Sequence, residues 1–211
     1  MSGQRFGVLG RNEGGWQADR DTASVGMSRF QIAACPLDGV QVITARTFED
    51  ERGWFMESYS LAALEPLGVG LTFVQDNHSL SRAAGTLRGL HYQLPPFAQD
   101  KLVRCVVGRI WDVAVDVRRR SPTFGRWFGI ELSAANRLQM LVPVGFAHGF
   151  MTLEPDSEVM YKVSATYSEP HETGIRWDDP ALAIDWPVVA SDPVLSDRDR
   201  RLPSLDEATL F

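Results

Sequence analysis

The chain of 211 residues has only two cysteines, Cys35 and Cys105, and they do not form a Cys-x-x-Cys pair. Nothing here favours a disulfide framework or a cysteine-rich metal site, and the default expectation is a reducing, cytoplasmic setting. The sequence also lacks an apolar run as long as a membrane span. No charged segment followed by an apolar one opens the chain, so neither a membrane anchor nor a secretory signal is expected.

Basic residues are outnumbered by acidic ones, 21 to 27, and the formal net charge is therefore −6. This balance argues against a nucleic-acid coat. The basic run Arg118-Arg119-Arg120 precedes Ser121-Pro122, and a solvated turn explains it better than a binding patch.

The four histidines, His78, His91, His148 and His171, include no His-x-His pair of the kind that barrels often use to hold a metal. A metal site built from His91, His148 and one of the acids is geometrically possible. It is not the favoured interpretation, and we expect neither a metal nor a cofactor.

Composition indicates one globular domain, with 44% hydrophobic and 23% charged residues. Residues 1–27 are rich in Gly, Arg, Asp and Ser and predict a disordered leader. Residues 28–211 then form the single domain, in which a proline-containing tail from Trp186 to Phe211 is expected to wrap the surface.

Strand-length runs rich in Val, Ile and aromatic residues dominate the middle of the chain. The predicted strands are Val40–Ile43, Trp54–Tyr59, Lys101–Val107, Ile110–Val117, Trp127–Leu132, Gln139–Val142 and Glu158–Val163. Gly108-Arg109 is placed as a hairpin turn would be, and Ser60–Leu67, with Ser60 as its N-cap, is the one convincing short helix. The predicted class is therefore all-β, as a sandwich or closed barrel with little helix.

Alternation within Ile110–Val117 gives this strand two unlike faces. One face is apolar and carries Trp111 and three valines. The other is small and acidic, and it carries Asp112 and Asp116. A barrel with a polar interior would use a strand in this way.

His91 lies in the segment Leu87–Gln93 and has two interpretations of about equal weight. It is a partly buried ring bonded to backbone, or it is a general base, since imidazole titrates near neutral pH. Arg88 and Lys101 lie close to His91 in sequence, and Arg52 lies in a charged loop. Each cation alone would be an exposed ion pair of little weight, but together they predict an anionic ligand such as a diphosphate.

Taken together, ten short segments resemble the dTDP-4-dehydrorhamnose 3,5-epimerase family, over the range Asp38 to Leu205. They are Asp50–Gly53, Glu57–Tyr59, Phe73–Ser79, Leu87–Gln93, Lys101–Arg104, Asp112–Arg118, Ser121–Gly125, Pro143–Phe150, Tyr161-Lys162 and Leu195–Asp199. Each is weak alone, whereas their common order is a strong signal.

The resemblance implies an all-β, cupin-like jelly roll with a few short helices. It implies an isomerase that inverts C3 and C5 of dTDP-4-dehydro-6-deoxyglucose, a dTDP-linked 4-keto-6-deoxy sugar, to give the rhamnose precursor. It further implies that His91 is the proton-abstracting base and that Asp199 orients and charges it. It also implies that Tyr161 is the proton donor on the other sugar face and that Lys101 lies beside the ketone oxygen.

The resemblance also supplies positions that bind the nucleotide sugar, and Tyr167 among them matches an aromatic that stacks on thymine. These positions are Arg52, Phe55, Glu57, Gln75, Asp76, Asn77, Arg88, His148, Tyr167, Glu172 and Arg198. The segment around Arg52 and Phe55 is expected to reach the partner's site in a homodimer. Nucleic acid and membrane are not expected partners.

The sequence departs from the family pattern in places that bear on the choice of sugar. Arg198 stands where Lys is frequent, Val144 where Glu is frequent, and Thr166 replaces the first of an aromatic pair. One residue is also inserted between Trp186 and Leu195. The alternatives are a C3-only epimerase on a related keto sugar, a non-catalytic sugar-nucleotide-binding cupin, and a metal-dependent cupin enzyme.

Overall fold

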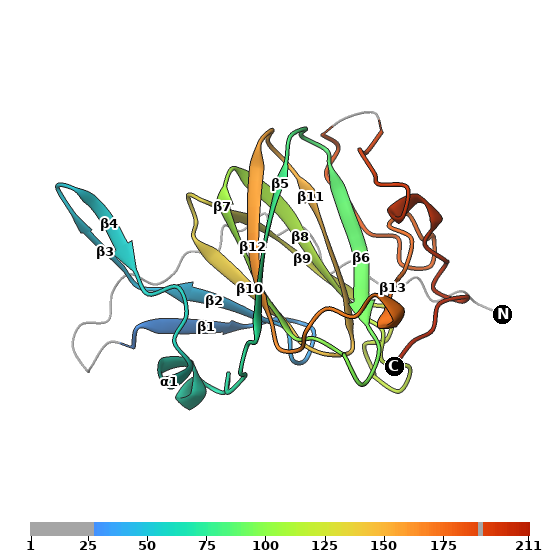
Figure 1. Cartoon of the computed structure of the whole chain (residues 1–211), viewed down its shortest axis with the longest axis horizontal. Coiled ribbons are helices and arrows are strands. Elements are labelled where there is room, and N and C mark those ends of the chain that lie inside the picture. The colour runs from blue at the N-terminus through green and yellow to red at the C-terminus, as the bar shows by residue number, and fades with distance from the viewer. Residues whose placement is uncertain (1–27, 190–191) are drawn as a thin grey trace.

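Two antiparallel sheets packed face to face form the body of the molecule (Figure 1). The structure, a computed structural model, describes residues 28–189 and 192–211, and the expected leader at residues 1–27 lies outside the described part. The all-β, cupin-like prediction is confirmed. No helix in the described part of the chain is long and apolar enough to cross a membrane.

The larger sheet has six strands, and the smaller has five. The six-stranded sheet runs in the order β1 (Phe30–Ala34), β2 (Gln41–Ala45), β10 (Leu138–Val142), β7 (Lys101–Val107), β12 (Ser157–Val163) and β5 (Gln75–Ser81). The five-stranded sheet runs in the order β13 (Glu172–Gly174), β6 (Leu87–Gln93), β11 (Phe146–Thr152), β8 (Arg109–Asp116) and β9 (Trp127–Ser133).

A separate hairpin, β3 (Thr47–Asp50) and β4 (Gly53–Met56), projects away from the two sheets (Figure 1). The helices of the described residues are short. They are α1 (Leu61–Leu64), η1 (Glu65–Leu67), η2 (Glu169–His171) and η3 (Asp199–Arg201), the last three being 3₁₀ turns.

All seven predicted strands are confirmed to within a few residues at each end. The predicted helix is α1 followed by η1, and Ser60 is its N-cap, although its side chain makes no capping hydrogen bond. The hairpin predicted at Gly108-Arg109 is wrong. Gly108 does turn with φ +74°, but β7 pairs with β10 and β12 while β8 pairs with β9 and β11. The chain therefore crosses from one sheet to the other at this turn.

Three apolar layers surround and separate the sheets. Val103, Ile110 and Met140 pack in the space between them, which we call the lumen. Leu102, Leu141 and Leu64 pack on the outer face of the six-stranded sheet, under α1. Leu182, together with Leu205 and Ala208 of the C-terminal tail, covers the outer face of the five-stranded sheet. The described part of the tail thus packs against this outer face.

The two faces predicted for the strand around residues 110–117 are also as expected. Ile110 and Ala114 face the lumen, and Val113, Val115 and Val117 pack under the tail. Asp112 belongs to the lumen face and is fully buried.

Two glycines bring β6 and β11 unusually close. A Cβ on Gly149 would lie 2.8 Å from the Arg88 carbonyl oxygen, and one on Gly89, at φ +133°, would lie 2.5 Å from Gly149 Cα. No larger residue fits such an approach without displacing backbone. As a result, His148 of β11 lies directly opposite His91 of β6.

Candidate active site

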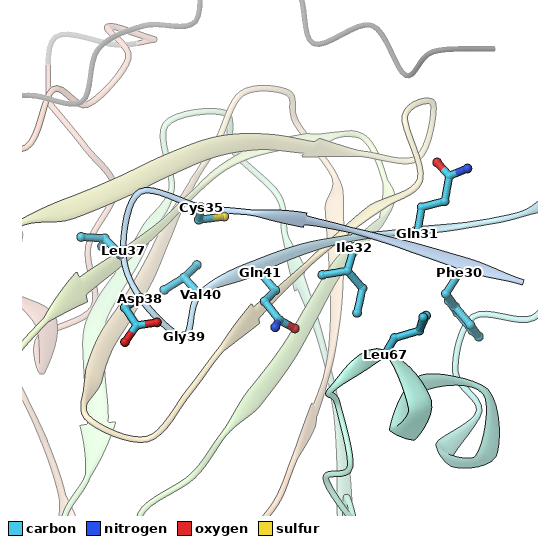
Figure 2. Close-up of a pocket in the computed structure, with 10 residues that line it drawn as sticks. All are labelled: Phe30, Gln31, Ile32, Cys35, Leu37, Asp38, Gly39, Val40, Gln41 and Leu67. Carbon is cyan, nitrogen blue, oxygen red and sulfur yellow. The ribbon is translucent and has the colours of Figure 1, made fainter. Parts of the chain in front are cut away.

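One hollow, of about 590 Å³, lies along β1 and β2 and not in the lumen (Figure 2). Among its ten lining residues, only Cys35 and Asp38 carry groups that titrate. Burial raises the pKa of the Cys35 thiol to about 11, so this thiol is not a nucleophile at neutral pH. The acid–base groups that the sequence predicts lie elsewhere, in and around the lumen.

His91 and Asp199 form a hydrogen-bonded pair, with 2.6 Å between Nε2 and Oδ1. The Asp199 side chain is only 5% exposed and His91 is 25% exposed. Burial alone would raise the pKa of Asp199, but hydrogen bonds from His91, Ser196 and the Gly89 amide hold it below its ordinary value. A carboxylate that accepts the Nε2 proton leaves Nδ1 of His91 as the basic nitrogen.

The C-terminal tail carries Asp199 to a histidine 108 residues away in sequence. Val194 exchanges backbone hydrogen bonds with Gly85 and Leu87, which attaches the tail beside the start of β6. Ser196 then fixes the carboxylate, because its Oγ donates to Asp199 Oδ2 at 2.7 Å and accepts from the Asp199 amide at 3.1 Å. The pair is therefore held by the tail rather than by neighbouring strands.

Lys101 and Tyr161 approach the same region from the six-stranded sheet. Lys101 lies opposite Val163 and Tyr161 lies opposite Val103, so the two side chains are diagonal neighbours on adjacent strands. The Lys101 ammonium donates to the His91 carbonyl oxygen at 3.2 Å. This contact joins the two sheets across the lumen.

The environment shifts the pKa of both groups. Burial lowers the pKa of Lys101 to about 8, against the opposing influence of the Glu172 and Asp112 carboxylates. Burial and the Glu172 carboxylate raise the pKa of Tyr161, against an opposing influence from Arg88. At neutral pH the lysine is mostly a cation and the tyrosine is a neutral O–H donor.

A second histidine–carboxylate pair lies deeper in the lumen. His148 Nε2 lies 2.8 Å from Asp112 Oδ1, and the side chains are 8% and 0% exposed. The other carboxylate oxygen, Oδ2 of Asp112, is buried without a hydrogen-bond partner. His148 is thereby fixed beside His91, with which it is in register.

Three of the predicted ligand-binding residues meet at the mouth of the lumen. Glu172 accepts hydrogen bonds from the Tyr167 hydroxyl at 2.7 Å and from the Arg198 guanidinium. Tyr167 is half exposed, at 52%. Its loop is held by Gln75, whose side-chain oxygen accepts from the Tyr167 amide at 3.1 Å.

The edge strand β5 presents predicted residues on two different faces. Gln75 and Asn77 share one face, and their side chains are hydrogen bonded at 2.9 Å. Asp76 points to the outer face, where it pairs with Lys162 at 2.9 Å. Arg88 spans the gap between β6 and β5, because its guanidinium donates to Ser81 Oγ and to the Leu80 carbonyl oxygen.

The hairpin residues lie apart from this group. Arg52 is 86% exposed and pairs with Asp50 in the β3–β4 turn, and Phe55 is 68% exposed. Glu57 pairs with Arg29 at 2.7 Å. The structure thus brings together the predicted residues of the lumen and its mouth, and it leaves Arg52, Phe55 and Glu57 outside that assembly.

Two residues that sequence reasoning did not assign belong to the site. Gln93 is buried and donates to the Phe97 and Thr166 carbonyl oxygens, while its oxygen accepts from the Ser168 amide at 2.7 Å. It ties the Tyr167 loop to β6, two residues from His91. The sequence signal for Gln93 was its position two residues after His91. The second residue is Asp112, for which the signal was the alternation that placed it on the interior face of its strand.

In the described residues, no group of three or more His, Cys, Asp and Glu side chains is arranged to hold a metal ion. The charged groups of the site instead form pairs: His91 with Asp199, His148 with Asp112, and Arg198 with Glu172.

Comparison with known proteins gives consistent similarity over most of the chain. Residues 34–207 match the family model described as dTDP-4-dehydrorhamnose 3,5-epimerase. A protein of that name from Shigella flexneri is 53% identical over 171 residues, which is 81% of this chain and 93% of the relative. One from Methanothermobacter thermautotrophicus is 42% identical over 186 residues, which is 88% of this chain and the whole of the relative.

Solved structures agree with the sequence relatives. The Legionella pneumophila dTDP-6-deoxy-D-glucose-3,5-epimerase in complex with dTDP-4-keto-L-rhamnose has a TM-score of 0.81 at 41% identity, over 85% of this chain and 95% of that one. A 3'-monoepimerase from Streptomyces bikiniensis in complex with dTDP-quinovose has a TM-score of 0.75 at 33% identity, over 82% and 86%.

Proposed function

Because the chain belongs to the dTDP-4-dehydrorhamnose 3,5-epimerase family, we propose that the lumen group of His91, Asp199, Lys101 and Tyr161 is its active site. The protein is an isomerase that inverts C3 and C5 of dTDP-4-dehydro-6-deoxyglucose. One observation carries the assignment of residues. His91 on one sheet is hydrogen bonded to Asp199 of the tail, Tyr161 on the other sheet is a neutral and partly buried tyrosine, and Lys101 lies beside both sheets' groups.

The chemistry requires a base, an acid and a cation. A proton beside the C4 ketone is weakly acidic, and its removal places negative charge on the ketone oxygen. His91 accepts that proton at Nδ1, and Asp199 stabilises the imidazolium that results. The Lys101 ammonium stabilises the enolate where its charge develops.

Inversion demands that the proton return from the other face of the sugar. A single base would restore the original stereocentre. Tyr161 projects from the sheet opposite His91, and its raised pKa keeps the hydroxyl protonated at neutral pH. Tyr161 therefore donates the second proton, and the two residues together convert one configuration into the other.

The nucleotide lies across the open mouth between β5 and β6. Arg88 and Arg198 supply the positive charge for the diphosphate, and Tyr167 offers a half-exposed ring for the base. Glu172, Gln75, Asn77 and His148 supply polar contacts, and Asp76, whose side chain points outward, contributes through its backbone. Binding replaces the contacts that Glu172 makes with Tyr167 and Arg198 in the free protein.

A homodimer in which the β3–β4 hairpin completes the partner's site accounts for the isolated hairpin residues. Phe48, Trp54 and Phe55 are about half exposed or more on this projection, and β1 is an edge strand that pairs only with β2 among the described residues. Mixing inactive His91→Ala protein with Arg52→Ala/Phe55→Ala protein restores one intact site in each mixed dimer. Recovery of about a quarter of wild-type activity is expected at random pairing, and no recovery would contradict a shared site.

Residues 28–211 are proposed to act as one domain in the cytoplasm, where the free thiols of Cys35 and Cys105 remain reduced.

The decisive experiment is turnover in deuterated water, followed by NMR. Incubation with dTDP-4-dehydro-6-deoxyglucose should place deuterium at C3 and C5 and yield the inverted sugar. Exchange at C3 alone would assign the C3-only alternative. Absence of exchange with tight dTDP-sugar binding would instead identify a binding protein and refute the enzymatic proposal.

A further inference from the structure

Asp112 is a buried carboxylate whose bonding is only half satisfied. Oδ1 is bonded to His148 at 2.8 Å, whereas Oδ2 has no hydrogen-bond partner and is shielded from solvent. A buried polar oxygen without a partner costs free energy of folding, and a buried unpaired charge costs more. Such a group calls for a balancing charge or a functional reason.

A substrate hydroxyl does not explain Oδ2, because the atom is inaccessible from the lumen in this structure. A purely structural role in holding His148 does not explain it either. That role requires an acceptor at Oδ1 only, and a neutral asparagine would fill it without burying a charge.

The remaining explanation is the Lys101 ammonium. The carboxylates whose fields act on Lys101 are Glu172 and Asp112. Glu172 is already engaged by Arg198 and Tyr167 at the mouth. Asp112 lies on the lumen face of β8, between Ile110 and Ala114, and its Oδ2 has no hydrogen-bond partner among the described residues.

We propose that Asp112 is a positioning residue of the epimerase site, which fixes His148 through Oδ1 and balances the Lys101 ammonium through the charge on Oδ2. The inference rests on the proposed function, because it explains how a partly buried lysine stays cationic when the enolate forms. Without that charge, Lys101 would lose its proton at a lower pH, and the enolate would lose its stabilising cation.

The charged and titratable groups around Lys101 come from every wall of the site. They are Asp112 of β8, His148 of β11, His91 of β6 with Asp199 of the tail, Glu172 of β13, Tyr161 of β12 and Cys105 of β7. Burial raises the pKa of Cys105 to about 11, so this thiol is neutral over the range tested here.

The sequence makes the test direct, because Lys101 and Lys162 are its only lysines. Protein labelled with ¹³C at lysine Cε gives two NMR signals. Lys162 lies on the outer face, paired with Asp76, and serves as an internal reference. Asp112→Asn keeps an acceptor for His148 and removes the charge. We expect the Lys101 midpoint to fall by about one pH unit and the Lys162 midpoint to stay in place.

The pH at which turnover is lost should shift in the same direction as the Lys101 midpoint. Lys101 is active when protonated, so the variant should lose activity at a lower pH than wild type on the basic side. A fall of one unit from a pKa of about 8 corresponds to roughly fivefold lower kcat at pH 8 and little change at pH 6. Affinity for dTDP alone should stay the same.

Asp116→Asn is the matched control, since Asp116 is a second fully buried carboxylate on β8 and pairs with Arg118 instead. It should reduce stability without moving the Lys101 midpoint. An unchanged Lys101 midpoint in Asp112→Asn, in an enzyme whose wild type exchanges deuterium, would overturn the inference and leave the proposed function intact. Absence of exchange in the wild type would refute the function itself.

A folding defect in Asp112→Asn does not remove the test. If the two charges balance, the double variant Asp112→Asn/Lys101→Met loses less Tm than the sum of the two single losses. Additive losses would show that the charges are independent and would refute the pairing.

Discussion

Asp199→Asn is the sharpest test of the His–Asp assignment, because it changes charge and hydrogen bonding and leaves the shape nearly unchanged. Asp199 accepts from His91 at 2.6 Å, from Ser196 Oγ at 2.7 Å, and from the Gly89 amide. An asparagine has one acceptor oxygen where the carboxylate has two. When its amide nitrogen faces His91, it donates to Nε2 and forces the ring proton onto Nδ1. The nitrogen that must accept the substrate proton is then blocked.

The size of the expected loss of activity follows from the roles of the Asp199 carboxylate. It selects the tautomer and stabilises the imidazolium, and loss of both in a hydrolase His–Asp pair lowers kcat by about 10⁴-fold. Asp199 is 5% exposed, so solvent does not replace the lost charge. We expect a decrease of about 10³- to 10⁴-fold in deuterium exchange at both carbons. Affinity for dTDP should remain within about twofold, because Asp199 contacts the base and not the nucleotide position.

The assay is single-turnover exchange in deuterated water, with dTDP binding measured by calorimetry on the same preparation. The pH dependence of the protein's stability provides an independent test. The folded-state pKa of Asp199 is lowered, so its contribution to stability is present above the unfolded value of 3.8 and is lost as pH falls through the folded value. The variant should lack this acid-side loss. Near-normal exchange in a folded variant would refute the assignment of Asp199.

Two further changes test other parts of the structure. Tyr161→Phe keeps the ring and removes the proton donor, so net inversion should fall by about 10²-fold while His91 still exchanges deuterium without inversion. Equal losses of inversion and of deuterium exchange would contradict separate roles for the two residues. Gly149→Ala places a Cβ 2.8 Å from the Arg88 carbonyl oxygen, so unfolding free energy should fall by about 1–3 kcal/mol or more in a thermal melt. Gly70→Ala, whose Cβ would meet only the Glu65 side chain at 3.7 Å, is the control and should melt like wild type.

Two of the strands that the sequence patterns missed, β5 and β6, differ from the predicted strands in what they line. β7, β8 and β12 bury apolar residues on at least one face, so their hydrophobic content marks them as strands. β5 reads Gln-Asp-Asn-His-Ser-Leu-Ser, and β6 contains Arg88, Gly89 and His91. These two strands form the wall and mouth of a polar site, so the hydrophobic pattern is absent where the function lies.

The wrong hairpin at Gly108-Arg109 has a related cause. A glycine with φ +74° between two apolar strands is typical of a tight hairpin, and local chemistry alone cannot distinguish it from a turn between sheets. The choice depends on which strands pair. β7 pairs with β10 and β12, and β8 pairs with β11 and with the next strand, β9, so neither pairs with the other. Long-range pairing decided the outcome, not the turn.

The position of Asp199 could be predicted only from the resemblance, because no periodicity links residues 91 and 199. The tail reaches His91 through backbone bonds at Val194 and the Ser196 contacts, both of which depend on the folded barrel. Asp112 illustrates the opposite case. Alternation placed it on the interior face, but the sequence does not indicate that its Oδ2 lacks a hydrogen-bond partner among the described residues, which is the basis of the role proposed for it.

The lumen contains two histidine–carboxylate pairs, whose histidines lie on the adjacent strands β6 and β11, and the exposure of the side chains separates the roles of the two pairs. His91 is 25% exposed and its partner 5%, whereas His148 and Asp112 are 8% and 0% exposed. A group that accepts and releases protons must be reached by substrate and, at some stage, by solvent. The pair containing His91 meets this condition. The pair containing His148 is suited to hold a fixed charge, because a buried charge acts through a weakly screened field and exchanges protons poorly. Exchange should therefore depend on Asp199 at every pH, and on Asp112 mainly where Lys101 begins to lose its proton.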